Sequence, residues 1–365
     1  MNVQDRVAKA INGEATDSVP IFIPGCDDRF RELFNAGQEI HHGDTVCIVN
    51  GQDLTPLVRL GVDMCEVQGP LHVKIDLDLP VLDDSSLRVD MYGRVFKRRV
   101  SGNVEHVTYQ GPFLRTMDQI EKWDHVVPID VEPGWHELVY NETLDAVDKH
   151  AICPTFKACD GFYSILEGAI GVENMAILLH DHPGIIDDLL ERIYRVVAAD
   201  VDALIKARIA FIFITDGITI DSRPCITPDL VYKHLRPLYK KLVGKIHAAG
   251  GKALFRTRGD VLDVMDTLVA AGFDAVHVAT PDPALIDEFL VTWGDKACAI
   301  GNFDVMSMLS QGTPVHVQKR AKEMVSSARQ HGQRYIFGTN DVLPGSAKLE
   351  NIEAMIGAVK QHGML

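Results

Sequence analysis

Two short apolar segments in the last quarter of the chain each run into a polar loop whose side chains could do chemistry. One leads into Asn302 and Asp304, and the other leads into Asn340 and Asp341. Carboxylates and amides can exchange protons with a substrate or hold its polar groups. Polar residues at the ends of successive strands are how (β/α) barrels build active sites. We therefore expect Asn340 and Asp341 to be catalytic, and Asn302 and Asp304 to bind substrate, unless Asp304 caps the next helix.

Two further carboxylates follow apolar segments earlier in the chain. Asp216 comes directly after 210–215, and Glu66 lies at the end of 62–67. A buried carboxyl without a partner has a raised pKa and can act as a proton donor. We expect Asp216 and Glu66 to share a common mouth with Asp341 as catalytic groups. The alternative for Asp216 is a cap of its own turn.

Basic residues lie at two further apolar segments. Arg256 directly follows the segment at 252–255, and His277 lies within the segment at 275–278. Arg256 and Arg258 are two positions apart, so an extended chain would turn both guanidinium groups to one side as a fork for a carboxylate or phosphate. Alternatively, one of them pairs with an aspartate across the mouth. His277 alternates with alanines and could face the barrel interior as a substrate ligand, or be a core histidine with satisfied hydrogen bonds.

The elements that must position these residues alternate regularly. Apolar, β-branched runs predict eight buried strands, at 19–23, 62–67, 151–156, 210–215, 252–255, 275–278, 297–300 and 335–337. Helical patterns at 162–179 and 183–206 precede the fourth strand. Later strands are followed by helices predicted at 228–249, 261–271, 283–292, 315–331 and 348–362. This alternation predicts an α/β fold, a (β/α)8 TIM barrel, as one domain over 1–365 with an N-terminal extension.

Residues 72–112 depart from this pattern. They alternate polar and apolar positions between turn sequences, which indicates an antiparallel excursion over the barrel mouth or at its side.

Composition excludes several classes of function. The chain has 46% hydrophobic residues, a formal charge of −15 and seven scattered cysteines without a Cys-x-x-Cys pair. Such a charge repels nucleic acid, and no apolar run is long enough for a membrane span. We expect a cytoplasmic protein with a small-molecule substrate, and a homodimer is left open as its assembly.

An ordered set of short motifs resembles the uroporphyrinogen decarboxylase-like superfamily. The motifs are Arg6-Val7, Asn12-Gly13-Glu14, Val19-Pro20, Gly61-Val62-Asp63, Leu166-Glu167-Gly168, Glu173-Asn174, Thr227-Pro228-Asp229-Leu230, Arg236-Pro237-Leu238-Tyr239 and Gly301-Asn302-Phe303-Asp304. This resemblance implies a TIM barrel with its site at the C-terminal ends of the strands. It also implies either decarboxylation of porphyrinogen side chains or methyl transfer involving a corrinoid that a separate protein carries.

Departures from the superfamily pattern narrow the choice. The Arg-rich loop of the decarboxylases is replaced by a loop with only Arg29 and Arg31, and the last histidine of the site is absent. By resemblance, Glu66 takes the place of the decarboxylase aspartate, and Tyr163 lies at or beside a substrate-binding tyrosine. The thiol-activating methyltransferases bind zinc through His-x-Cys-Gly, where this chain has Arg256-Thr257-Arg258-Gly259. Arginine cannot ligate a metal, so no zinc is expected there.

We therefore predict the methyltransferase component of a corrinoid-dependent demethylation system. It would move a methyl group from a small methylated, methoxylated compound to a corrinoid on a partner protein. Two alternatives remain open, namely a carboxy-lyase of the uroporphyrinogen decarboxylase type and a barrel that binds a ligand without catalysis.

Overall fold

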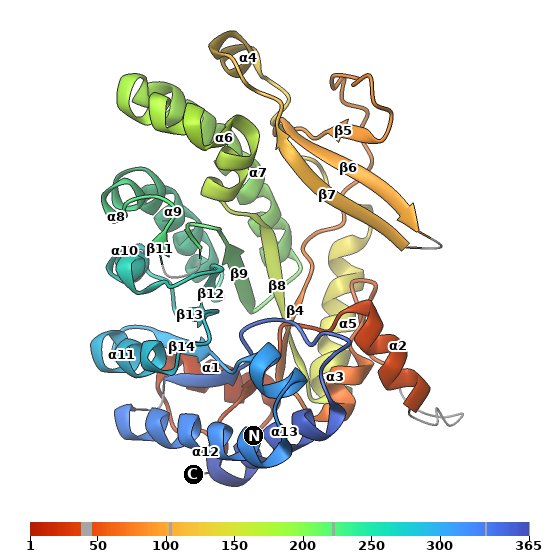
Figure 1. Ribbon diagram of the computed structural model, residues 1–365, viewed down its shortest axis with the longest axis vertical. Helices are drawn as coiled ribbons and strands as arrows, with labels where there is room; N and C mark the ends of the chain where they lie inside the picture. The colour runs from red at the N-terminus through yellow and green to blue at the C-terminus, as the bar shows by residue number, and fades with distance from the viewer. Residues whose placement is uncertain (38–45, 102–103, 221–222, 333, 365) are drawn as a thin grey trace.

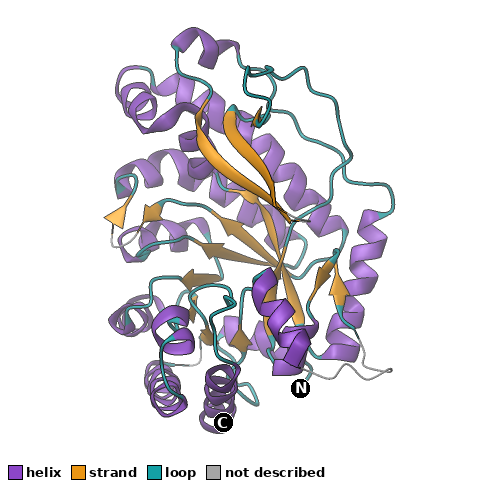
Figure 2. Cartoon of the chain, turned by 45° about the vertical axis from the view of Figure 1, so that its right-hand side comes forward, coloured by secondary structure: helices purple, strands orange, loops and turns teal. Residues whose placement is uncertain are grey.

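The computed structural model describes the chain except for residues 38–45, 102–103, 221–222, 333 and 365. Eight parallel strands close into a barrel surrounded by helices (Figures 1 and 2). The barrel strands are β1 (Ile21–Phe22), β4 (Met64–Val67), β8 (Cys153–Asp160), β9 (Phe211–Thr215), β12 (Lys252–Arg256), β13 (Ala275–Val278), β14 (Cys298–Gly301) and β15 (Tyr335–Gly338). The predicted (β/α)8 barrel and all eight of its strands are confirmed.

Helices connect these strands and cover the outside of the barrel. They are α1 (Val3–Asn12), α2 (Asp28–Gly37), α3 (Thr55–Leu60), α4 (Met117–Lys122), α5 (Trp135–His150), α6 (Phe162–Asp181), α7 (Pro183–Lys206), α8 (Pro228–Leu230), α9 (Arg236–Ala248), α10 (Met265–Ala271), α11 (Pro283–Trp293), α12 (Pro314–His331) and α13 (Leu349–Gly363). Tighter or wider helical turns are η1 (Val231–Leu235), η2 (Leu262–Val264) and η3 (Val305–Ser310). The helix predicted at 228–249 is therefore a succession of α8, η1 and α9 rather than one regular helix.

The barrel interior is a small core of its own. Alternate side chains of the strands fill it, including Phe22, Met64, Phe213 and Leu254, all fully buried. The amphipathic helix α1 closes the N-terminal end of the barrel, because its apolar face joins this core. A larger core lies between the strands and the outer helices. Both ends of the chain lie at the same end of the molecule (Figure 1).

The predicted excursion forms a three-stranded antiparallel sheet of β5 (Leu87–Val89), β6 (Arg94–Ser101) and β7 (Val104–Pro112). It lies beside α6 at the top of Figure 1. The Tyr109 hydroxyl donates a hydrogen bond to the Gly168 carbonyl of α6 at 3.0 Å. The sheet begins only at Leu87, so the first third of the predicted excursion is not part of it. The remaining short strands are β2 (Ile48–Val49), β3 (Gln52–Asp53), β10 (Thr219–Ile220) and β11 (Arg223–Pro224).

Helix α6 is long and apolar enough to cross a membrane by length and composition. Half of that stretch is buried inside the protein, and Gly171 interrupts its helical geometry with φ 81° and ψ 158°. It packs against α7 and β7 as an outer helix of the barrel.

Candidate active site at the barrel mouth

A cross-barrel ion pair occupies the centre of the mouth. Arg256 ends β12, and its Nη1 lies 3.2 Å from Oε2 of Glu66, which is on β4. Its Nη2 lies 3.7 Å from Oδ1 of Asp341, in the loop after β15. The side chains of Arg256 and Glu66 are 18% and 11% exposed, whereas that of Asp341 is 68% exposed. The structure thus brings together three predicted site residues, and the only cation among them is paired twice.

His277 lies below this ion pair, inside the barrel. It is fully buried, pairs in register with Arg256 and makes an edge contact with the ring of Phe22. Its Nε2 is 2.9 Å from the Thr339 carbonyl oxygen, so this nitrogen carries the proton. Burial and the nearby Arg256 lower the pKa of His277 to about 3. The imidazole is therefore neutral at ordinary pH and holds the loop that carries Asp341.

Asp216 is enclosed by hydrogen-bond donors. Its carboxylate accepts hydrogen bonds from the backbone amides of Tyr163 and Ser164 at 3.0 and 2.9 Å. The Ser164 hydroxyl at 3.0 Å and the Tyr239 hydroxyl at 2.7 Å complete the set. Burial raises the pKa of Asp216, while these donors act in the opposite direction. The alternative that Asp216 serves as a cap fits this geometry, although the capped element is the first turn of α6 rather than its own turn.

Three more predicted residues make contacts within the loops. Asp304 accepts hydrogen bonds from the backbone amides of Met306 and Ser307, as the N-cap of η3. Asn340 accepts a hydrogen bond from the backbone amide of Val305 at 3.0 Å. Asn302 donates to two carbonyl oxygens of the loop after β13, and its own side-chain oxygen is buried without a partner among the described residues. These contacts order the loops around the mouth.

A cavity of about 480 Å³ opens beside the ion pair, between the ends of β8, β9 and β12 and the start of α6. Three of the residues predicted to form the site line this cavity, namely Tyr163, Arg258 and the buried Asp216. Arg258 is exposed and has no hydrogen bond or ion pair with any described residue. The two arginines predicted to form a fork therefore separate, with Arg256 at the central ion pair and Arg258 at the cavity.

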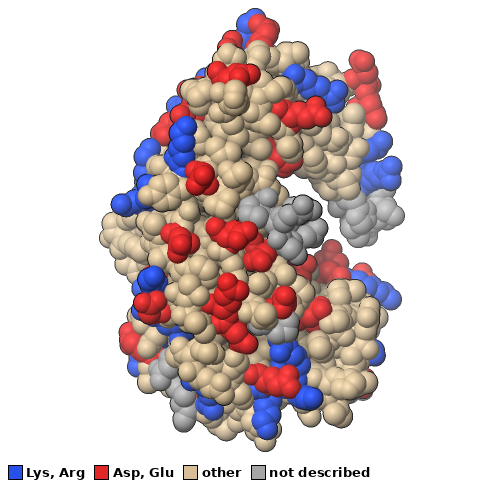
Figure 3. Space-filling view, turned by 60° about the vertical axis from the view of Figure 1, so that its left-hand side comes forward, with Lys and Arg blue, Asp and Glu red and all other residues tan. Residues whose placement is uncertain are grey.

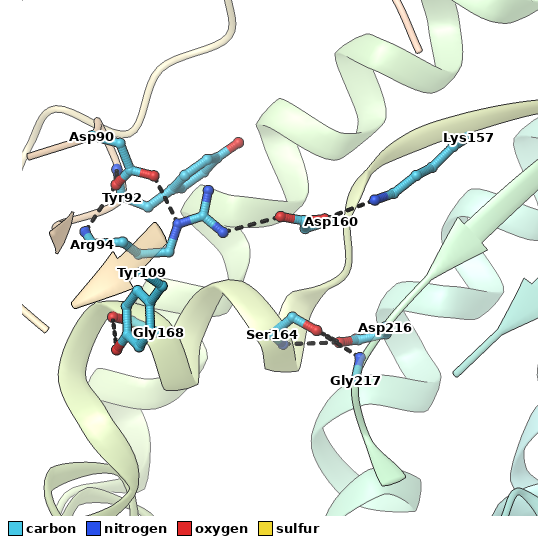
Figure 4. Close-up of polar contacts among 10 residues, drawn as sticks. All are labelled: Asp90, Tyr92, Arg94, Tyr109, Lys157, Asp160, Ser164, Gly168, Asp216 and Gly217. Atoms are coloured by element: carbon cyan, nitrogen blue, oxygen red, sulfur yellow. Dashed lines mark hydrogen bonds and ion pairs between the residues drawn. The ribbon is translucent and has the colours of Figure 1, made fainter. Parts of the chain in front are cut away.

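The rim of this cavity is tied to the excursion by a chain of charges (Figure 4). Arg94 of β6 contacts Asp90 at 2.7 Å and Asp160 of β8 at 3.1 Å, and Asp160 contacts Lys157 at 3.0 Å. Burial raises the pKa of Asp160, but Lys157 and Arg94 outweigh it and lower the pKa overall. The excursion is therefore attached to Asp160, a residue of β8 that lines the cavity.

Several residues that line the cavity are not among the predicted site residues. They are Lys157, Asp160, Ser164, Glu167, Thr215, Thr219 and Thr257. Strand β8 continues four residues beyond its predicted end, which brings Lys157 and Asp160 to the mouth. The spacing of residues 163, 164 and 167 on one helical face was the available signal for the α6 side.

Acidic side chains gather across the middle of the face in Figure 3, beside a hollow between the upper part, which carries the excursion, and the barrel. A second cavity of about 330 Å³ lies on the other side of Glu66 and includes Cys26, Arg31 and Asp53 in its lining. Burial raises the pKa of Cys26 to about 11, so its thiol is protonated at neutral pH.

Within the described ranges, no three His, Cys, Asp or Glu side chains are grouped closely enough to hold a metal ion. At the positions where related thiol methyltransferases bind zinc, the guanidinium of Arg256 contacts two carboxylates and that of Arg258 lies at the cavity. These residues do not fit a zinc site.

The sequence profile of the uroporphyrinogen decarboxylase (URO-D) family matches residues 114–362. The chain belongs to the uroporphyrinogen decarboxylase family. The matched part of this family member begins just after the excursion and includes eight of the predicted site residues on or after strands β9 to β15, together with Tyr163 on α6. No curated protein matches the sequence.

A solved structure supports the same fold. A methyltransferase from Methanosarcina mazei is 15% identical and superposes with a TM-score of 0.63, covering 99% of each chain. The exo-β-1,4-mannosidase Op5Man5 from Opitutaceae bacterium strain TAV5 is 12% identical, with a TM-score of 0.47 over 94% of this chain and 60% of that chain. At these identities, the first likeness shows a shared fold, and the second adds nothing to it.

Proposed function

We propose that this family member is the methyltransferase component of a corrinoid-dependent demethylation system. Its substrate would be a small methoxylated compound held in the cavity at the ends of β8, β9 and β12. The methyl acceptor would be a reduced corrinoid on a partner protein, which supplies a nucleophilic cobalt. Family membership and the fold shared with a methyltransferase make the proposal reasonable, and the charges at the mouth favour it over decarboxylation.

The observation that carries the proposal is the paired state of Arg256. A porphyrinogen brings several carboxylates, which need free cations to bind them. Arg256 is already neutralised by Glu66 and Asp341. A mouth arranged in this way suits a neutral substrate better than a polycarboxylate.

The loop that replaces the Arg-rich loop supports the same conclusion. Arg29 lies 3.2 Å from Glu32, and Arg31 lies 3.0 Å from Asp28, both on α2. Neither arginine points an unpaired charge at the mouth. The resemblance would assign these two arginines to porphyrinogen carboxylates. Here each of them is paired instead with an acidic residue of its own helix.

The residues of the cavity suit a methoxylated compound. Tyr163 offers a hydroxyl group beside the apolar side chain of Val172, whereas the Ser164 hydroxyl already donates to Asp216. Burial raises the pKa of Tyr163 above its usual range, so the phenol remains a hydrogen-bond donor. Because the zinc positions hold Arg256 and Arg258, we do not propose a thiol as the methyl acceptor.

A second candidate is a carboxy-lyase acting on a smaller, singly charged substrate. The guanidinium of Arg258 at the cavity, which pairs with no described residue, favours it, since one carboxylate could bind there. The same group could also anchor a methoxylated benzoate, so Arg258 alone does not separate the two reactions.

Both reactions can be assayed on the purified protein. We expect methyl transfer from at least one methoxylated compound, such as a methoxybenzoate, to free reduced cobalamin. We expect no carbon dioxide from uroporphyrinogen. If the protein released carbon dioxide from a carboxylated substrate and transferred no methyl group, the proposed methyltransferase would be wrong and the carboxy-lyase would be favoured.

A further inference from the structure

The carboxyl groups that the sequence offers as acids are all engaged. Both oxygens of Asp216 accept hydrogen bonds from two donors each, and the residue is 0% exposed. Glu66 and Asp341 both contact the guanidinium of Arg256. None of the three is therefore a free proton donor that faces the cavity. An ether needs such a donor, because an alkoxide or phenoxide leaves slowly without a proton.

Glu167 is the carboxyl that meets this need. It lies on α6, one turn after Tyr163 and Ser164, and all three line the cavity. Glu167 is half-buried and makes no hydrogen bond or ion pair with any residue in the described part of the chain. Burial raises the pKa of its carboxyl. The same helix face thus presents the Tyr163 hydroxyl and a protonatable acid to whatever occupies the cavity.

We propose that Glu167 donates the proton to the departing oxygen of the methyl donor, an inference that rests on the proposed methyl transfer. The methyl–oxygen bond breaks, and the methyl carbon bonds to the electron pair of the reduced corrinoid. The bonding pair stays on the oxygen, which takes the proton of Glu167. The products are an alcohol or phenol and the Glu167 carboxylate, which regains a proton from water.

Charged and titratable groups surround Glu167 from every packed element. Tyr163 and Asp216 lie on the side of the barrel, and Tyr109 of β7 on the side of the excursion. The other charged side chains that line the cavity are Lys157 and Asp160, which form an ion pair with each other, and the exposed Arg258. Arg94 packs on Gly168 next to Glu167, but it is paired with Asp90 and Asp160. No ion pair with a described residue therefore holds Glu167 as a carboxylate.

The test varies the leaving group. Glu167→Gln keeps the shape of the side chain but has no acidic proton, and Glu173→Gln is the matched control on the exposed side of α6. We expect Glu167→Gln to slow demethylation of an alkyl methyl ether about 10²-fold. Demethylation of 4-nitroanisole should change less than about 3-fold, because nitrophenolate leaves without a proton. Glu173→Gln should resemble the wild type with both substrates.

If Glu167 had only a structural role, Glu167→Gln would slow the demethylation of both substrates equally. That result would overturn the proposal. Glu167→Asp retains a carboxyl, so it should recover part of the rate with the alkyl ether. If Glu167→Asp and Glu167→Gln were equally slow, the carboxyl would not be the acid.

A second readout needs no corrinoid. Carbon-13 labelling of the glutamate carboxyls should show one resonance that titrates above the usual glutamate range and is lost in Glu167→Gln. Absence of such a resonance would contradict the proposal. If the resonance is present but the wild type transfers no methyl group from any ether, the proposed function fails and the protonation state of Glu167 stands. If methyl transfer occurs and Glu167→Gln equals the wild type, only the role of Glu167 fails.

Discussion

The carboxylate of Asp216 links the loop after β9 to the first turn of α6 and to Tyr239. Hydrogen bonds to a buried charged group contribute more than those between neutral groups. Replacing Asp216 by Asn turns one oxygen into an amide nitrogen that faces two donors. We expect the free energy of unfolding to fall by about 3 kcal/mol. Chemical denaturation measures this change.

Asp229→Asn is the control, because Asp229 is exposed in α8. It should stay within about 0.5 kcal/mol of the wild type. An equally small effect of Asp216→Asn would show that the carboxylate is not the cap of α6.

His277 predicts an acid-sensitive contribution to stability. Its pKa is about 3 in the folded protein and near the ordinary value of 6.5 after unfolding. Below pH 6.5, the unfolded chain takes up a proton that the folded protein does not, so stability falls as the pH falls towards 3. The loss is about 1.4 kcal/mol per pH unit.

Denaturation between pH 6 and pH 4 should therefore show a steeper fall in the free energy of unfolding for the wild type than for His277→Gln. The difference in slope should correspond to the uptake of about one proton on unfolding. His316→Gln, at an exposed histidine of α12, should keep the wild-type slope. Identical slopes for the wild type and His277→Gln would mean that this histidine is charged in the folded protein.

Single residues show what a sequence can and cannot predict about a site. Asp304 was offered as either a ligand or a cap, and the local spacing to Met306 and Ser307 makes it a cap. Glu167 is not among the catalytic residues predicted from the sequence, where it appears only within the motif Leu166-Glu167-Gly168. Only the folded structure shows that it lines a cavity and has no partner among the described residues.

At the scale of elements, α6 and the end of β8 line one wall of the cavity, and the excursion is attached to both. Arg94 joins them, because it contacts Asp90 within the sheet and Asp160 at the end of β8. Arg94→Met should therefore loosen β6 and β7 relative to the barrel. We expect faster amide hydrogen exchange in these two strands, with unchanged protection in β13 and β14.

Arg99→Met is the matched variant, at an exposed arginine of the same strand. It should leave the exchange of β6 and β7 as in the wild type. Faster exchange throughout the barrel in Arg94→Met would mean that Arg94 supports the whole fold rather than this wall.

The elements themselves were largely predictable. Apolar, β-branched runs marked all eight strands, since parallel barrel strands are buried on both sides. The end of β8 was missed because the charged residues Lys157 and Asp160 interrupt its apolar pattern and resemble a loop. The antiparallel sheet of the excursion was predicted from alternation, whereas its contact with α6 depends on Arg94 and Tyr109, which no local pattern singles out.

At the scale of the whole molecule, the barrel brings together side chains from strands far apart in the sequence. Glu66 and Arg256 are separated by 190 positions and meet across the mouth. Strand order predicts that both lie at the mouth, but not that they pair. The pairing decides the proposed substrate class, because it removes the central cation from use by an anionic ligand.

The most direct test of this claim measures whether Arg256 is available to a polycarboxylate. The probe is benzene-1,2,4,5-tetracarboxylate, and calorimetry compares the wild type with Glu66→Gln/Asp341→Asn and with Arg256→Gln. We expect weak binding to the wild type and to Arg256→Gln. The double variant, which frees the guanidinium, should bind at least about tenfold more tightly, equivalent to about 1.4 kcal/mol. Tight binding to the wild type that Arg256→Gln abolishes would contradict the account and favour a decarboxylase.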